Sequence, residues 1–293
     1  MLILTLFAAA TIAAAPPEAP GSDTIDVKGR RAEEVREEAK TYVRSVRVAE
    51  NERPVARWLD PVCPKALGVS EAVAAKVEAR VRTIAREAGI EVAGARCAPN
   101  LNIAFADDGA AMAKFVTSRS SKQFVTLSGR EILELGTSDA PLRWWHSVES
   151  RTSEGRRSMG GDLPGFAQDD NGMIGAAGQI YPQYSSSRIS SKMVRALVNA
   201  TVVIDVNRAK GNELDSVTDF AALVGLAEIK PSDPPPPNSI LRLFDGGALQ
   251  LTTLDAQFLT ALYRLPLDRT AIAQRGLLLR GLVEGSTLRR PGR

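Results

Sequence analysis

The sequence predicts an α+β fold in which a mixed β-sheet packs with helices, and three observations lead to this class. Hydrophobic residues make up 44% of the 293-residue chain and charged residues 24%, as is usual for a protein that buries a core. Apolar residues recur at helical spacing in several segments, with short β-rich runs between them. Strand, helix and strand alternate between residues 55 and 105, which favours a layered arrangement.

The first 15 residues are typical of a secretory signal peptide. Residues 2–15 carry no charged side chain. A run of about 14 apolar residues suits a signal sequence better than a membrane span of about 20. No Lys or Arg precedes the run, so an uncleaved N-terminal anchor is the alternative. Since no later apolar segment is long enough to span a membrane, we expect a periplasmic or secreted protein.

Residues 16–50 are expected to form a linker followed by an amphipathic helix. Within residues 31–47, Val35, Ala39 and Val43 recur at helical spacing among many charges. This helix could be a solvated arm or could dock on the rest of the protein. We expect residues 51–293 to form one α+β globular domain.

The first half of this domain contains the clearest helix. Ser70 is a candidate N-cap, Val77 and Val81 lie on one face, and Gly89 is expected to end the helix. Strands are predicted over residues 55–59, 90–92, 101–105 and 142–148, and further helices over residues 110–116 and 128–135.

The second half begins with a glycine-containing stretch, residues 149–181, which we predict to be a long loop. A β-rich segment follows over residues 193–206. The next helix, over residues 214–228, has Ser216 and Asp219 at the spacing of a capping box. Two terminal helices are predicted over residues 253–265 and 270–282.

Cysteine usage predicts one disulfide. Cys63 and Cys97 are the only cysteines of the chain, and two cysteines in an exported protein normally pair. Closing a loop of this length stabilises a fold by about 3–4 kcal/mol. Two buried free thiols are the alternative.

The charge and histidine content exclude several functions. The net charge is +3 and acids are interleaved with bases, so we expect no nucleic-acid partner. His146 is the only histidine, which rules out a zinc site with two histidine ligands. As a catalytic base, His146 would need a carboxylate or a nucleophile brought to it by the fold. The simpler interpretation is a partly exposed histidine on a strand.

Trp144 and Trp145 are neighbours on the same predicted strand. On a strand their side chains point to opposite faces, so one is expected in the core. The other is a candidate for lining a groove that binds an apolar, sugar-like or peptide ligand. Simple packing of both rings is the alternative.

The last third of the chain contains four segments that carry a family resemblance, residues 201–205, 217–226, 239–241 and 254–263. Through them the chain resembles an uncharacterised family of secreted bacterial proteins with a zincin-like (metzincin-type) domain, over about residues 186–284. In catalytic zincins the helix carries H-E-x-x-H-x-x-G-L, in which two histidines bind zinc and the glutamate activates water. Aligned on Gly225 and Leu226, the histidine positions fall on Thr218 and Ala222, and the glutamate position on Asp219.

The upstream region resembles the same family through Cys63-Pro64 and the segment from Cys97 to Leu101. The resemblance implies a zincin-like frame without its metal ligands, and hence no metal and no cofactor. We therefore expect a non-catalytic exported protein that binds an envelope protein or a peptide, or that has a structural task in the cell envelope. The alternative is an envelope hydrolase that uses His146 with nearby carboxylates.

Overall fold

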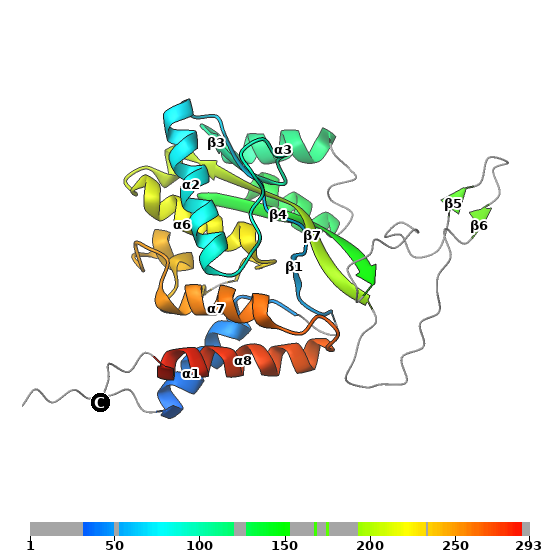
Figure 1. Ribbon diagram of the computed structural model, residues 1–293. Helices are drawn as coiled ribbons and strands as arrows, with labels where there is room; N and C mark the ends of the chain where they lie inside the picture. Colours follow the sequence, from blue (N-terminus) through cyan, green and yellow to red (C-terminus); the bar gives the residue numbers. More distant parts are fainter. Residues whose placement is uncertain are drawn as a thin grey trace, which may run out of the picture. The chain divides into compact units, whose positions relative to one another are not determined.

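The fold of the computed structural model is organised around one long strand, β7, Met193–Asp205 (Figure 1). The structure describes residues 32–49, 53–119, 127–152, 167–168, 174–175, 193–232 and 234–288. The predicted signal peptide and most of the predicted glycine-containing loop lie outside these residues. The main strands are β1 (Ala56–Trp58), β2 (Pro64–Leu67), β3 (Leu101–Ala106), β4 (Leu142–Thr152) and β7 (Met193–Asp205), and a separate short pair is formed by β5 (Ala167–Gln168) and β6 (Ile174–Gly175).

β7 pairs along both of its edges. One edge is antiparallel to β4 over the whole length of β4, with one register irregularity between Ser147 and Val148. The other edge is parallel to β1 near its beginning and to β3 near its end. β2 continues the sheet beyond β3, also in parallel. The sheet is therefore mixed, as predicted, and is mostly parallel.

Helices cover the two faces of this sheet unequally. The larger hydrophobic core lies on the face of α2 and α6, and a smaller cluster around Trp145 lies on the face of α3 and α4. Val202 and Ile204 of β7 face the large core, whereas Val203 faces the small one, as the two-residue period of a strand requires. The helices are α1 (Ala32–Ser45), α2 (Glu71–Glu87), α3 (Gly109–Arg119), α4 (Gly129–Thr137), α5 (Val206–Ala209), α6 (Leu214–Leu226), α7 (Thr253–Arg264) and α8 (Ala271–Leu288), with a 3-10 turn, η2, at Ile240–Asp245.

α6 is the central helix, and it is buried from Ser216 to its end. Gly225 allows it to pack closely on the sheet, because a Cβ at this position would lie 2.6 Å from Cδ1 of Leu101 in β3. The indole Nε1 of Trp58 donates a hydrogen bond of 3.1 Å to the carbonyl of Gly225. α6 is thus attached to the sheet by both packing and a buried hydrogen bond.

The N-terminal helix α1 is docked rather than solvated. Tyr42 is fully buried and donates a 2.7 Å hydrogen bond to Oδ1 of Asp255 in α7. Asp255 also accepts from the hydroxyl of Ser239 and from the backbone of Ile240. One buried carboxylate therefore joins α1, α7 and the 3-10 turn, and Ala32 onwards forms one compact unit with the rest of the chain.

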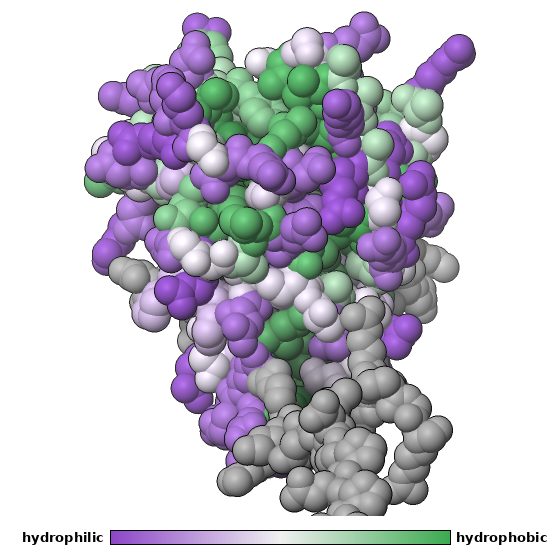
Figure 2. Space-filling view, turned by 90° about the vertical axis from the view of Figure 1, so that its left-hand side faces the viewer, coloured by the Kyte–Doolittle hydropathy of each residue, from purple (hydrophilic) through white to green (hydrophobic). Residues whose placement is uncertain are grey.

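The surface carries both hydrophobic and hydrophilic patches. On the side shown in Figure 2, hydrophobic patches are separated by hydrophilic ones. Among the residues that the structure describes, the exposed large apolar side chains are Leu67, Phe115, Leu133, Val206, Leu249 and Ile272. Exposed apolar side chains of this kind are normal on a folded protein and do not by themselves mark an interface.

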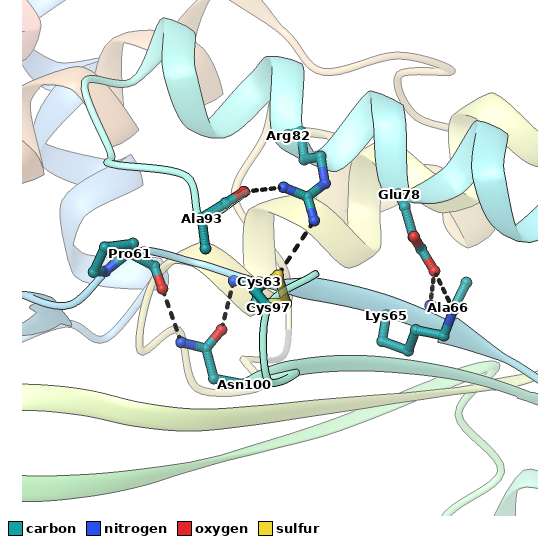
Figure 3. Close-up of a disulfide and its surroundings, with 9 residues drawn as sticks. All are labelled: Pro61, Cys63, Lys65, Ala66, Glu78, Arg82, Ala93, Cys97 and Asn100. Carbon is teal, nitrogen blue, oxygen red and sulfur yellow. Dashed lines mark hydrogen bonds and ion pairs between the residues drawn. A yellow bond between two sulfur atoms is a disulfide. The ribbon is translucent and has the colours of Figure 1, made fainter. Parts of the chain in front are cut away.

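The predicted disulfide is present (Figure 3). Cys63 and Cys97 are joined with their Cα atoms 6.0 Å apart, and the bond ties the start of β2 to the turn before β3. The side chain of Asn100 supports this junction, because its Oδ1 accepts from the Cys63 backbone at 2.7 Å and its Nδ2 donates to the Pro61 carbonyl.

Three local predictions were wrong. Asp219 does not form a capping box with Ser216, because the N-cap of α6 is Glu213 and Asp219 pairs elsewhere. The predicted strand at residues 90–92 is only an isolated bridge between Val92 and Val62. The loop predicted from residue 149 begins later, because β4 continues to Thr152.

Candidate binding groove

The outer edge of β4 is one of the edges of the sheet that the structure describes. Within the described residues, β4 pairs with no strand other than β7. The backbone N–H of Asp205 donates to the carbonyl of Pro141, which sets the alternation of hydrogen bonds along this antiparallel pair. The backbone groups of Leu142, Trp144 and His146 therefore point away from β7.

A groove of about 340 Å³ runs along this edge. Its volume is near the lower end of the range for ligand sites, about 300–1,000 Å³. β4 forms its floor through residues 142–146. The walls are supplied from both faces of the sheet: Leu127, Glu131, Glu134, Leu135, Ser138 and Ala140 on the α4 side, and Arg47, Arg53, Glu228, Ile229, Lys230 and Pro231 on the α6 side.

Trp144 positions the wall on the α6 side. Its indole Nε1 donates a 2.7 Å hydrogen bond to the carbonyl of Ile229, in the segment that follows α6. Its ring makes an edge contact with Phe220, with ring centroids 5.8 Å apart. Trp145 points to the opposite face and is 2% exposed in the small core. The two tryptophans thus lie on opposite faces of the sheet. Trp144 is partly buried, and it both lines the groove and packs against the large core.

An ion pair joins the two walls across the edge of β4. Nζ of Lys230 lies 2.9 Å from Oε1 of Glu131 in α4. Burial disfavours the ionised form of Glu131, but hydrogen bonds from the Ser128 backbone and from Lys230 outweigh it and lower the pKa to about 2. Glu131 is therefore ionised at neutral pH, and its pair with Lys230 partly covers the edge.

His146 lies on the floor of the groove but is almost entirely buried. Its Nε2 is 2.7 Å from the carbonyl of Val224 in α6. Since a carbonyl only accepts, Nε2 carries the proton. Burial lowers the pKa of His146, against the opposing effect of Glu228. A neutral imidazole that donates to the backbone of α6 has a clear structural task, which is to hold β4 against that helix.

The three positions that the resemblance assigns to a degenerate metal site are core positions. Thr218 is 1% exposed and its hydroxyl donates to the Leu214 carbonyl, while Ala222 is fully buried. Both carboxylate oxygens of Asp219 are engaged, by a two-pronged ion pair with Arg80 at 2.6 and 2.9 Å and by the backbone N–H of Leu251. These residues do not fit a zinc ion, because a methyl group cannot ligate and the carboxylate is already occupied.

Two further observations concern the described residues as a set. They contain no cluster of three or more His, Cys, Asp or Glu side chains placed to hold a metal ion. Their helices include none that combines the length and the apolar character needed to cross a membrane.

Comparison with known proteins adds no relative: no family model, curated protein or solved structure matches this chain. Fold and site therefore define the class by themselves. The protein is a disulfide-bonded α+β domain with a mixed sheet and a groove along the antiparallel edge strand.

The sequence pointed to only part of this groove. Trp144 and His146 stood out as rare residue types on one strand. Glu131, Lys230 and Arg143 gave no signal, because charged residues are common and their meeting depends on the fold. Lys230 and Glu131 are 99 positions apart in the chain.

Proposed function

We propose that this protein is an exported, non-catalytic binding domain that takes up an extended peptide along the outer edge of β4. The observation that carries the proposal is the groove over an edge strand in which the backbone groups of Leu142 and Trp144 point outwards. An exposed strand edge is a template for a further strand, and several peptide-binding domains use it in this way.

The side walls suit the alternation of an added strand. Side chains of a bound strand point alternately to the two faces. On one face they would contact Trp144 and Pro231, and on the other Leu127 and Leu135. The partly exposed ion pair between Lys230 and Glu131 would have to open, and pairs at the protein surface contribute about 0.2–1 kcal/mol. A bound strand can replace this loss with two or three backbone hydrogen bonds.

Location and the absence of catalysis are parts of the same proposal. The Cys63–Cys97 disulfide supports an oxidising compartment, such as the periplasm or the exterior. Thr218, Asp219 and Ala222 serve the core in this proposal, so the zincin-like resemblance would describe a frame without its chemistry. The hydrolase alternative would require His146 to act as a base, while its Nε2 already donates to Val224.

The test is a peptide selection followed by backbone methylation. Octapeptides are selected from a random display library on the purified chain, and the best binder is synthesised with N-methyl groups at each position in turn. Strand addition predicts that methylation at alternate positions abolishes binding, whereas methylation at the positions between them has little effect. Equal tolerance at all positions, or a selection that yields no binder, would contradict the proposal.

A further inference from the structure

The groove contains a buried arginine whose hydrogen-bonding capacity is largely unused. Arg143 is 2% exposed and lines the groove from β4. Its Nη2 donates to the carbonyl of Ser138. Within the described part of the chain, its Nε and Nη1 have no hydrogen-bond partner. A buried guanidinium normally has its N–H groups satisfied, so this arrangement marks a place for an acceptor.

The nearest carboxylate does not fill that place. Oδ2 of Asp205 lies 4.0 Å from Nη1 of Arg143, which is beyond hydrogen-bond range. Asp205 is occupied by other donors, since its Oδ2 accepts from the backbone of Gly109 and its Oδ1 from the backbone of Arg208. The guanidinium of Arg208 also lies within 3.5 Å of Asp205. Arg208 has a second carboxylate, Asp139, at 2.6 Å. Asp205 therefore accepts from Gly109 and Arg208 and leaves Nε and Nη1 of Arg143 without a hydrogen bond.

The charges along the groove are also unequal. Four cations line it, Arg47, Arg53, Arg143 and Lys230, against three carboxylates, Glu131, Glu134 and Glu228. Two of these carboxylates pair with cations from outside the groove: Glu134 with Arg130, and Glu228 with Arg195. The third pairs with Lys230. Counted by formal charge, the side chains that line the groove carry one more positive than negative charge.

Resting on the proposed peptide-binding function, we propose that the peptide is acidic and that one of its carboxylates pairs with Arg143. The free Nε and Nη1 groups can donate to a carboxylate, the planar acceptor that a guanidinium fork matches best. The exposed Arg53, which also lines the groove, favours further negative charge on the same ligand. The carboxylate is either an Asp or Glu side chain or the C-terminus of the peptide.

The test compares octapeptides that differ in one charge. Acetylated and amidated peptides of alternating Thr and Val carry Glu, Gln or Lys at one position, scanned along the chain, and a fourth peptide is neutral with a free C-terminus. Binding is measured by isothermal titration. At the best position we expect the Glu peptide, or the peptide with the free C-terminus, to bind at least tenfold more tightly than the Gln peptide, with Lys weakest.

Variants identify the arginine. In Arg143→Met the preference for Glu over Gln should fall to below about twofold, and in Arg86→Gln, an exposed arginine of α2 outside the groove, it should be unchanged. If Arg143→Met does not fold, the variant Arg53→Gln, at an exposed arginine, gives a second test. Its preference for the Glu peptide over the Gln peptide should be two- to threefold smaller than that of the parent at low salt.

The outcomes separate the two proposals. Equal binding of the Glu and Gln peptides, with alternate N-methyl sensitivity retained, would overturn the assignment of Arg143 and leave edge binding standing. A preference for Glu that persists in Arg143→Met would also overturn it. Failure of every peptide to bind would overturn both.

Discussion

Restoring the histidines that the zincin resemblance would require tests whether α6 is a core helix or a relict metal site. The variant is Thr218→His combined with Ala222→His. Both positions are at most 1% exposed, so each imidazole must enter a packed interior. Overpacking of this kind destabilises by about 1–3 kcal/mol per site. Each buried ring nitrogen without a partner adds about 1–3 kcal/mol.

Together the two substitutions should lower the free energy of unfolding by about 4–12 kcal/mol, against a total of about 5–15 kcal/mol for a typical protein. We therefore expect the double variant to be largely unfolded and each single variant to lose about 2–6 kcal/mol in urea unfolding. The exposed Asp215→His on the same helix is the control, expected within about 0.5 kcal/mol of the parent. A double variant that folds normally and binds one zinc ion per chain would refute the argument that these positions are core.

Three further predictions concern the stability that the disulfide, His146 and Glu131 contribute. Replacing both Cys63 and Cys97 by alanine should lower the free energy of unfolding by about 4 kcal/mol, from the 34-residue separation of the cysteines; a loss below about 1 kcal/mol in urea would contradict this. Burial lowers the pKa of His146, so below pH 6.5 the unfolded protein binds more protons than the folded protein, and stability should fall as the pH drops from 6.5. The variant His146→Gln should lose this pH dependence. A pH profile of stability that is the same in the variant and the parent would contradict the prediction. The pKa of Glu131 is lowered from 4.5 to about 2, so the stability that its carboxylate provides is complete above pH 4.5 and is lost as the pH falls towards 2. The difference in free energy of unfolding between the parent and Glu131→Gln should therefore shrink over that interval. A difference that stays constant would contradict the prediction.

Local signals explain which elements the sequence predicts well. Ser70 caps α2 as expected, through a hydrogen bond from the backbone of Val73, and Gly89 follows the helix with a φ of +83°, which glycine adopts readily. Each of these features involves residues a few positions apart. The α+β class and the opposite faces of Trp144 and Trp145 also follow from short-range patterns, whereas the disulfide follows from the presence of only two cysteines.

Long-range pairing explains what the sequence does not predict. Asp219 looked like a capping residue by its spacing to Ser216, but its partner is Arg80, 139 positions away. β2 is only four residues long and is a strand because it lies beside β3. The groove depends on the same kind of contact, since Arg143 and Lys230 reach it from segments that are far apart in the chain.

Backbone amide exchange along β4 tests the central claim most directly. The chain is measured by NMR with and without the Glu-containing octapeptide at saturation. Strand addition predicts that exchange slows at Leu142 and Trp144, whose amides point outwards, while Arg143 and Trp145, whose amides face β7, change little. Unchanged exchange at these two outward amides with peptide bound would contradict edge binding.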